Sequence, residues 1–250
     1  MTQTDMSARR FIGRCYLAAG MIALGVVTLR AGSYVLRRQS APSPFAGEHW
    51  PAYLSAFVLL AGGIGLVVRR AALAASGVVL AYAAFWLVVL KLPPIVTHAG
   101  TEGYLESAGE VAVIAAGAWQ VFRSMRSRDD SAPHRRNRLP ALLCGVALIP
   151  IGLSHFVYLK DSVAFVPAWL PVRRMWAIVA GAGHLAAGVA LITGIVPRLA
   201  ARLEAVMLTL FAVLVWLPGV IATNGGGVWT EMVITALVAA GAWSVGDGVE

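Results

Sequence analysis

The sequence predicts an all-α integral membrane protein with eight transmembrane helices, arranged as two parallel four-helix repeats. Three observations lead to this prediction. Hydrophobic residues make up 59% of the 250 residues and charged residues only 13%, about half the charged share of a typical soluble domain. Several apolar runs reach the length of about 20 residues that crosses a hydrocarbon core. Segments of the first half also recur, in the same order, in the second half.

Eight apolar runs are long enough to serve as membrane spans, and they lack the alternating pattern of barrel strands. Because lipid offers the backbone no hydrogen-bond partner, each run is expected to be a helix. The runs cover 13–30, 51–68, 71–91, 104–121, 140–158, 175–195, 199–219 and 229–246.

A basic polar stretch at 123–139 divides the chain into a first repeat, 1–122, and a second repeat, 140–250. The sequence AAGAW occurs in both repeats, at 115–119 and again at 239–243, and other matches have the same offset of 124 or 125 residues. Four spans in each half make both halves run in the same direction. Their symmetry axis is therefore expected to lie along the membrane normal.

The net charge of +8 is explained by the membrane topology. The larger share of the Lys and Arg residues falls in the loops on the side of the N-terminus, which predicts that both termini and the basic linker are cytoplasmic. We therefore expect a protein of the bacterial cytoplasmic (inner) membrane. Its environment is the lipid bilayer, and the charge does not indicate a nucleic-acid partner.

His155 stands out in the span 140–158, where it shares one helical stripe with Cys144, Leu148 and Ile151. Pro150 removes one intrahelical hydrogen bond, so a kink is expected about one turn before the histidine. An ionisable residue within a span is a functional candidate by default.

His184 lies near the middle of the span 175–195, on one face with the small residues Ala177, Gly181 and Gly188. Small residues at this spacing let helices pack closely in lipid, so the histidine is expected to point into the bundle. Two interpretations stay open: a functional site, or a neutral histidine that makes one interhelical hydrogen bond.

The remaining polar residues give weaker indications. Glu110, within the span 104–121, needs a partner, for which Lys91 or a histidine is available. No HExxH motif or tight ligand spacing occurs, so no metal site is predicted. Cys15 and Cys144 form no CxxC motif, and the cytoplasmic side is reducing, so we interpret them as small buried residues.

Three motifs of the second half carry a family resemblance: GLSHF at 152–156, VPAWLP at 166–171 and GHLAAG at 183–188. With them, residues 140–246 resemble the DoxX-like membrane family, and the first half resembles it more weakly. The resemblance implies a four-helix membrane unit. The family usually carries a glutamate where this chain has His184. Some relatives look like the membrane subunit of thiosulfate:quinone oxidoreductase or like partners of enzymes in thiol and oxidant defence.

Together these features favour a redox-associated membrane subunit that is linked to quinone and to thiol or thiosulfate oxidation. His155 or His184 would hydrogen-bond a quinone carbonyl and pass protons, because histidine exchanges protons near neutral pH. Trp169, Trp176 and Glu110 complete the expected cofactor-binding set, with the two tryptophans flanking the ring. Haem ligation by both histidines is disfavoured, because their depths on the helical rise differ by about 10 Å or more.

Two alternatives stay open. One is a non-catalytic scaffold that holds a partner subunit at the membrane, with self-association into a homo-oligomer also compatible. The other is a carrier of small lipophilic solutes, which parallel repeats permit; the only helix interruption expected from the sequence is at Pro150. If the protein is an enzyme, we expect a membrane oxidoreductase subunit that uses quinone.

Overall fold

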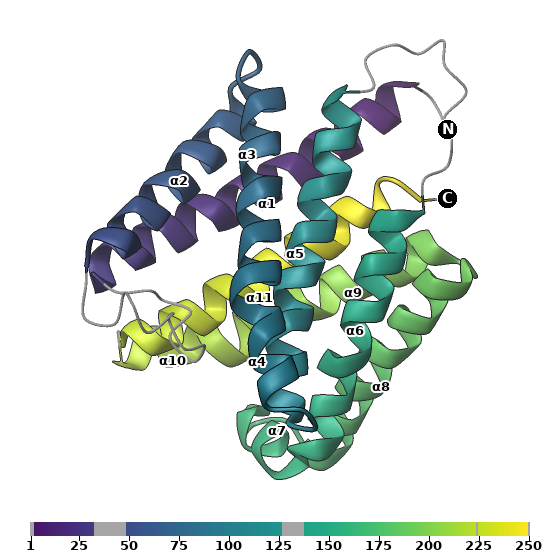
Figure 1. Ribbon diagram of the computed structural model, residues 1–250. Coiled ribbons are helices and arrows are strands. Elements are labelled where there is room, and N and C mark those ends of the chain that lie inside the picture. Colours follow the sequence, from purple (N-terminus) through teal and green to yellow (C-terminus); the bar gives the residue numbers. More distant parts are fainter. Residues whose placement is uncertain (1–2, 33–48, 127–137, 224, 250) are drawn as a thin grey trace.

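The computed structural model describes residues 3–32, 49–126, 138–223 and 225–249. Within these ranges the regular elements are all helices, and there is no strand (Figure 1). Most of the predicted basic linker, at 127–137, lies outside the described residues. The prediction of an all-α fold is confirmed.

The helices follow one another in two series, each of which contains long helices and one π-helical turn in a similar order. The first series is α1 (Gln3–Ala31), α2 (Trp50–Val67), α3 (Ala72–Phe85), η2 (Trp86–Lys91), α4 (Leu92–Thr97) and α5 (Glu102–Arg126). The second is α6 (Leu139–Val157), α7 (Leu159–Phe165), α8 (Arg173–Thr193), α9 (Pro197–Phe211), η3 (Ala212–Trp216), α10 (Leu217–Thr223) and α11 (Gly226–Gly246). The segments η2 and η3 are single turns of π-helix that continue α3 and α9.

Seven helical stretches in the described part of the chain are long and apolar enough to cross a membrane. They are Phe11–Ala31, Trp50–Val67, Ala72–Thr97, Leu139–Val157, Arg173–Thr193, Pro197–Thr223 and Gly227–Gly246. They correspond to seven of the predicted spans, with ends shifted by a few residues. The protein is therefore a multi-pass membrane protein that contacts lipid. The predicted span 104–121 is also helical, but it belongs to α5, which carries three glutamates and is less apolar than the others.

The two ends of the bundle serve as reference points below. At one end, which we call the terminal end, α11 finishes and α6 begins, and the labels of both chain termini lie there (Figure 1). The opposite end, at which α5 begins and α7 lies, is called the α7 end.

α5 and α11 form the centre of the bundle, and they cross each other at two glycines (Figure 1). A Cβ atom added at Gly117 would lie 2.8 Å from the carbonyl oxygen of Gly241 and would also collide with its Cα atom. Each of these residues is the third residue of an AAGAW sequence. The helices can therefore touch backbone to backbone at this point, as small residues allow in membranes.

α6 and α8 pack along their length through a second set of glycines. A Cβ atom at Gly145 would lie 2.8 Å from the Gly188 oxygen, and one at Gly152 would lie 2.9 Å from the Gly181 oxygen. As the residue number rises on α6 it falls on α8, so the two helices are antiparallel. These contacts set the register of the helix pair that carries both histidines.

Two long helices are interrupted by π turns, at η2 and η3. The sequence led us to expect an interruption only at Pro150, which lies inside the continuous helix α6. Pro93 and Pro94 follow the π turn η2, and Pro218 follows η3. The carbonyl groups four residues before these prolines, which lose their α-helical hydrogen bonds, lie within the two π turns. A proline lacks the N–H that an α-helix needs and crowds the carbonyl four residues earlier, which a wider π turn relieves. The expectation of a single interruption was therefore wrong. Because a π turn also rotates the face of the helix that follows it, it changes which residues point inward.

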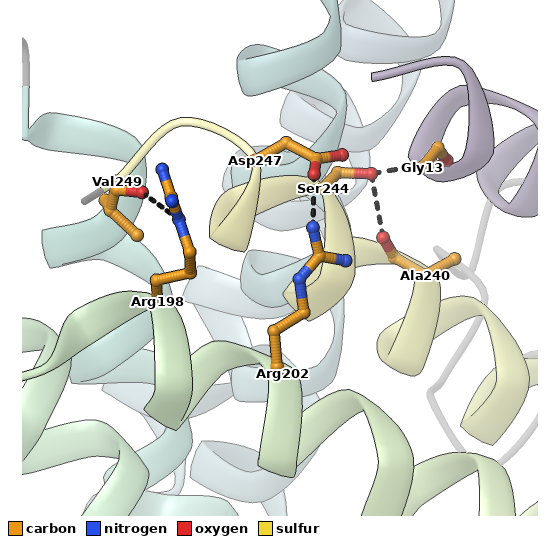
Figure 2. A network of polar contacts seen from close by, with 7 residues as sticks. All are labelled: Gly13, Arg198, Arg202, Ala240, Ser244, Asp247 and Val249. Carbon is orange, nitrogen blue, oxygen red and sulfur yellow. Dashed lines mark hydrogen bonds and ion pairs between the residues drawn. The ribbon is translucent and has the colours of Figure 1, made fainter. Parts of the chain in front are cut away.

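At the terminal end, a polar network joins α9, α11 and α1 (Figure 2). Arg202 forms an ion pair with Asp247 and lies 3.7 Å from the centre of the Trp243 ring. The Nε of Arg198 donates to the carbonyl oxygen of Val249 at 2.8 Å. Ser244 Oγ donates to the Ala240 oxygen at 2.8 Å and approaches the Gly13 oxygen at 3.4 Å. The network therefore holds α9 in place at the end of the bundle opposite α7.

Candidate functional site

The structure brings the two predicted histidines together. The ring centres of His155 and His184 are 5.0 Å apart, with the planes inclined by 49°. The depth difference expected from the helical rise applies to the backbone positions, so the argument drawn from it against haem ligation by both histidines does not hold for the rings.

The rings meet because of the direction in which helical side chains point. In the register set by Gly152 and Gly181, His155 lies level with residue 178 of α8, six positions from His184, or about 9 Å along the axis. Every Cα–Cβ bond in a helix leans toward the N-terminus of that helix. Because α6 and α8 are antiparallel, the ring of His155 leans toward the terminal end and the ring of His184 leans toward the α7 end. Because the two side chains tilt toward each other, their rings meet although the backbone positions are separated along the helix axes.

Glu204 on α9 completes the site and was missed from the sequence. Its Oε1 lies 2.6 Å from Nδ1 of His184, and each of the two residues is only 1% exposed. The other carboxylate oxygen, Oε2, is buried and has no hydrogen-bond partner among the described residues. A carboxylate within the apolar run 199–219 was the signal that could have found it, since an ionisable residue at such a place is a functional candidate.

The aromatic ring beside the histidines is that of Phe211, at the end of α9. Its centre lies 6.4 Å from the His155 ring and 6.2 Å from the His184 ring. Trp169 is 69% exposed, and Trp176 donates from Nε1 to the Pro171 oxygen at 3.0 Å. The described structure shows no ring contact between either tryptophan and a histidine.

Accessibility falls from one member of the site to the next. His155 is half-buried, whereas His184 and Glu204 are buried. Nδ1 of His155 lies 3.0 Å from the carbonyl oxygen of Ile151. Because a carbonyl only accepts, Nδ1 carries a proton, and in the neutral ring the lone pair is on Nε2. The site therefore presents one partly accessible imidazole that is backed by a buried imidazole–carboxylate pair.

Glu110 lies in a different place from the histidines. It lines a separate cavity of about 30 Å³ between the helices of the first half and α11, together with Leu59, Tyr82 and Trp86. Lys91 lies within electrostatic range of Glu110, and its Nζ donates to Ser107 Oγ at 2.7 Å. Lys91 is thus the charged neighbour of Glu110, as was expected.

Both cysteines are free thiols. Cys144 is fully buried on the face of α6 that also carries Ile151 and His155, and Cys15 is partly buried on α1. Neither cysteine belongs to a group of three or more metal-ligating side chains in the described ranges.

Comparisons of the chain with protein-family models, with curated proteins and with solved structures found no match. The interpretation of the site consequently rests on the residues and on their geometry.

A pH-dependent contribution to stability is predicted from Glu102, which lies at the α7 end outside the seven candidate spans. Burial raises the pKa of this carboxyl group from 4.5 to about 7, and the nearby Glu106 carboxylate adds to the rise. The folded state therefore binds more protons than the unfolded state between these two values. Its free energy of unfolding should fall as the pH rises from about 4.5 to about 7.

The measurement is unfolding in mixed micelles over this pH range. Glu102→Gln should remove this part of the slope, whereas Asp161→Asn, which changes an exposed carboxylate at the same end, should leave it in place. An identical slope in the wild type and in Glu102→Gln would contradict the assignment.

Proposed function

We propose that the protein is a redox-associated, DoxX-like membrane subunit in which His155, His184 and Glu204 exchange protons with a quinone that enters from the lipid. The observation that carries the proposal is the buried contact of 2.6 Å between His184 and Glu204, with the half-buried His155 ring against it. A buried charge is costly in lipid and is typical of functional sites.

The residues of the site fit a quinone headgroup. Phe211 offers an apolar ring face next to both histidines. His155 offers one ring nitrogen that is not engaged by Ile151, and Glu204 Oε2 is a buried polar atom that has no hydrogen-bond partner in the described part of the chain. His155 and Phe211 would therefore hold the headgroup, with His184 and Glu204 behind them. A bound quinone would supply two-electron redox chemistry that is coupled to proton transfer.

The side chains of the chain manage the protons. Nε2 of His155 accepts a proton when the bound group releases one and donates a proton when the bound group takes one up; in the resting neutral ring, Nδ1–H is held on the Ile151 oxygen. When His155 is an imidazolium, the Glu204 carboxylate stabilises it across the His184 ring. Helix packing around Gly152 and Gly181 excludes water from the inner pair, which strengthens these electrostatic interactions.

The proposed architecture is eight spans in two parallel repeats, with residues 104–121 of α5 as the eighth span. Three observations support it. The π turns η2 and η3 begin 126 residues apart, at 86 and 212. The equivalent residues Gly117 and Gly241 touch each other, as expected where a two-fold axis passes between them. In addition, α1 packs on α11 in the same way that the corresponding helix α6 packs on α5.

The proposed orientation places the terminal end in the cytoplasm of a bacterial cell and the α7 end outside. Arg14, Arg138, Arg198 and Arg202 all lie toward the terminal end, in agreement with the enrichment of cytoplasmic loops in basic residues. In this orientation His155 lies nearer the outer face and Glu204 nearer the inner face.

A carrier of small lipophilic solutes is the second candidate, and the pair of π turns favours it. Interrupted helices at corresponding positions of two repeats are typical of transporter binding sites. Phe211, the ring next to the histidines, directly precedes η3, so the interruption and the proposed site are adjacent.

Quinone binding by the purified protein tests the proposal. The protein would be placed in nanodiscs and titrated with a decyl-substituted 1,4-benzoquinone, with quenching of tryptophan fluorescence as the signal. His155→Gln should raise the Kd about tenfold, the effect of about one lost hydrogen bond. His98→Gln is the matched control, because His98 is exposed and stacks on Tyr104 at 4.8 Å.

Equal affinities in the wild type and in His155→Gln would contradict the proposed site. Saturable movement of the benzoquinone across vesicles that contain the protein, unchanged by His155→Gln, would favour the carrier.

A further inference from the structure

A second polar chain leads from the α7 end to His155, and it begins on the other half of the molecule. Ser154 on α6 lies 3.1 Å from Oε1 of Glu106 on α5 and donates its hydroxyl to this carboxylate. Ser154 is only 4% exposed, so the contact lies inside the interface between α5 and α6. A carboxylate of the first half thus contacts the residue that directly precedes His155.

Ser154 and His155 are also joined through one carbonyl oxygen. Ser154 Oγ lies 2.8 Å from the Ile151 oxygen, and His155 Nδ1 lies 3.0 Å from the same atom. Both side chains thus converge on the Ile151 oxygen. The single hydroxyl hydrogen of Ser154 points either to this oxygen or to Glu106, and when it points to Glu106 a lone pair of Oγ is left to accept a proton.

Glu102, one helical turn before Glu106 on α5, extends the chain toward the α7 end. Both of its carboxylate oxygens are buried and have no hydrogen-bond partner in the described residues. The polar groups Glu102, Glu106 and Ser154 therefore follow one another from the end of α5 to the edge of the site.

We propose that Glu106 and Ser154 form the proton path between the α7 end and His155, with Glu102 as the next group toward that end. The inference rests on the proposed function of the histidine site and adds the route by which its protons reach water. It also gives the first half, which has no counterparts of His155 and His184, a part in the chemistry.

One proton moves from the bound group to water in the following steps. Nε2 of His155 gains a proton from the substrate, and the imidazolium releases its Nδ1 proton to the Ser154 hydroxyl oxygen. Ser154 passes its own hydroxyl proton to the Glu106 carboxylate, and Glu106 releases a proton toward Glu102 and water. One proton enters at Nε2 and one leaves at Glu106, and the ring ends as the neutral Nε2–H tautomer, from which a reversal of tautomer restores the starting state.

Other titratable groups surround this path. Glu110 lies one turn further along α5 and faces the Lys91 ammonium. Tyr158, between α6 and α7, places its hydroxyl 3.5 Å from the Cβ position of Gly103, beside Glu102. His184 and Glu204 lie on the far side of His155, and α11, which also packs on α5, carries Glu231. The Glu106 carboxylate accepts a hydrogen bond from Ser154 on α6.

The test measures exchange of the His155 ring proton with water. The full-length protein, labelled with ¹⁵N-histidine, is placed in nanodiscs, and its ring signals are assigned with His155→Gln. Glu106→Gln should slow exchange at His155 by about tenfold or more, because a positioned acid or base contributes about 10²–10⁴-fold to a proton transfer. Ser154→Ala should have a similar effect.

Asp161→Asn is the control, since it neutralises an exposed carboxylate at the same end of the molecule. It should leave the exchange rate within about twofold, an effect far smaller than that of a positioned acid or base. An unchanged rate in both Glu106→Gln and Ser154→Ala, with folding intact, would overturn the path. If benzoquinone binding depends on His155 while Glu106→Gln has no effect, the path alone fails; if slowed exchange occurs without benzoquinone binding, the proposed function alone fails.

Discussion

Replacement of His184 by alanine should destabilise the protein by about 1–3 kcal/mol, the typical cost of leaving a buried hydrogen-bonding group without its partner. The reason is the position of Glu204, whose carboxylate would keep its buried place without the 2.6 Å contact to Nδ1. The measurement is the free energy of unfolding in mixed micelles at neutral pH. His98→Ala, at an exposed histidine, should cost less than about 0.5 kcal/mol, as is usual for surface substitutions.

The double variant His184→Leu with Glu204→Leu separates stability from function. It removes both polar groups and fills the space with apolar atoms, so it should recover most of the stability that His184→Ala loses. The same double variant should not bind the benzoquinone with the affinity of the wild type, because the buried pair behind His155 is gone. A loss of less than about 0.5 kcal/mol for His184→Ala, the effect of an ordinary surface substitution, would contradict the buried contact.

The second large effect is expected at the central crossing of α5 and α11. Gly117→Ala places a methyl group against the backbone of Gly241, with 2.8 Å to its oxygen, and neither partner has a side chain that could move away. The helices must separate, so we expect a destabilisation of about 1–3 kcal/mol or more. Gly241→Ala should cost a similar amount, because its Cβ atom would lie 2.6 Å from the Val113 oxygen.

Gly77→Ala in α3 is the matched control. Its Cβ atom would lie 3.5 Å from the Phe122 ring, an ordinary contact, and alanine is favoured over glycine by about 1 kcal/mol inside a helix. The control should therefore be neutral or stabilised. Because Gly117 and Gly241 share one contact, the double alanine variant should lose less stability than the two single losses added together. Equal stability of Gly117→Ala and Gly77→Ala would contradict the crossing.

Much of the fold could be predicted because the membrane restricts the choices. Apolar runs of sufficient length must be helices in lipid, and their positions follow from composition alone. α5 was the difficult case, since its glutamates and many alanines and glycines make it less apolar than its neighbours. Its place at the centre of the bundle, covered by other helices, removes the need for an apolar outer face.

The candidate site could be predicted only in part. His155 and His184 were visible as ionisable residues in apolar runs, but the rise of a helix says nothing about the direction of a side chain. Their meeting depends on the opposite lean of two antiparallel helices, which requires the register set by Gly152 and Gly181.

Glu204 and Phe211 come from α9, whose packing against α8 could not be derived from spacing along the chain. The contact between Glu106 and Ser154 joins residues 48 positions apart in different halves. The π turns were also missed, because a proline in a sequence marks a lost hydrogen bond without showing how the helix accommodates that loss.

The central claim is that the second half of the molecule holds a quinone at His155, and native mass spectrometry tests it most directly. The protein would be released from its own membranes into mild detergent, and the masses of the wild type and of His155→Gln would be compared. The account predicts a stoichiometric quinone mass on the wild type that is lost in the variant, with His98→Gln retaining it. A wild-type protein that carries no such mass, or a quinone that remains bound to His155→Gln, would contradict it.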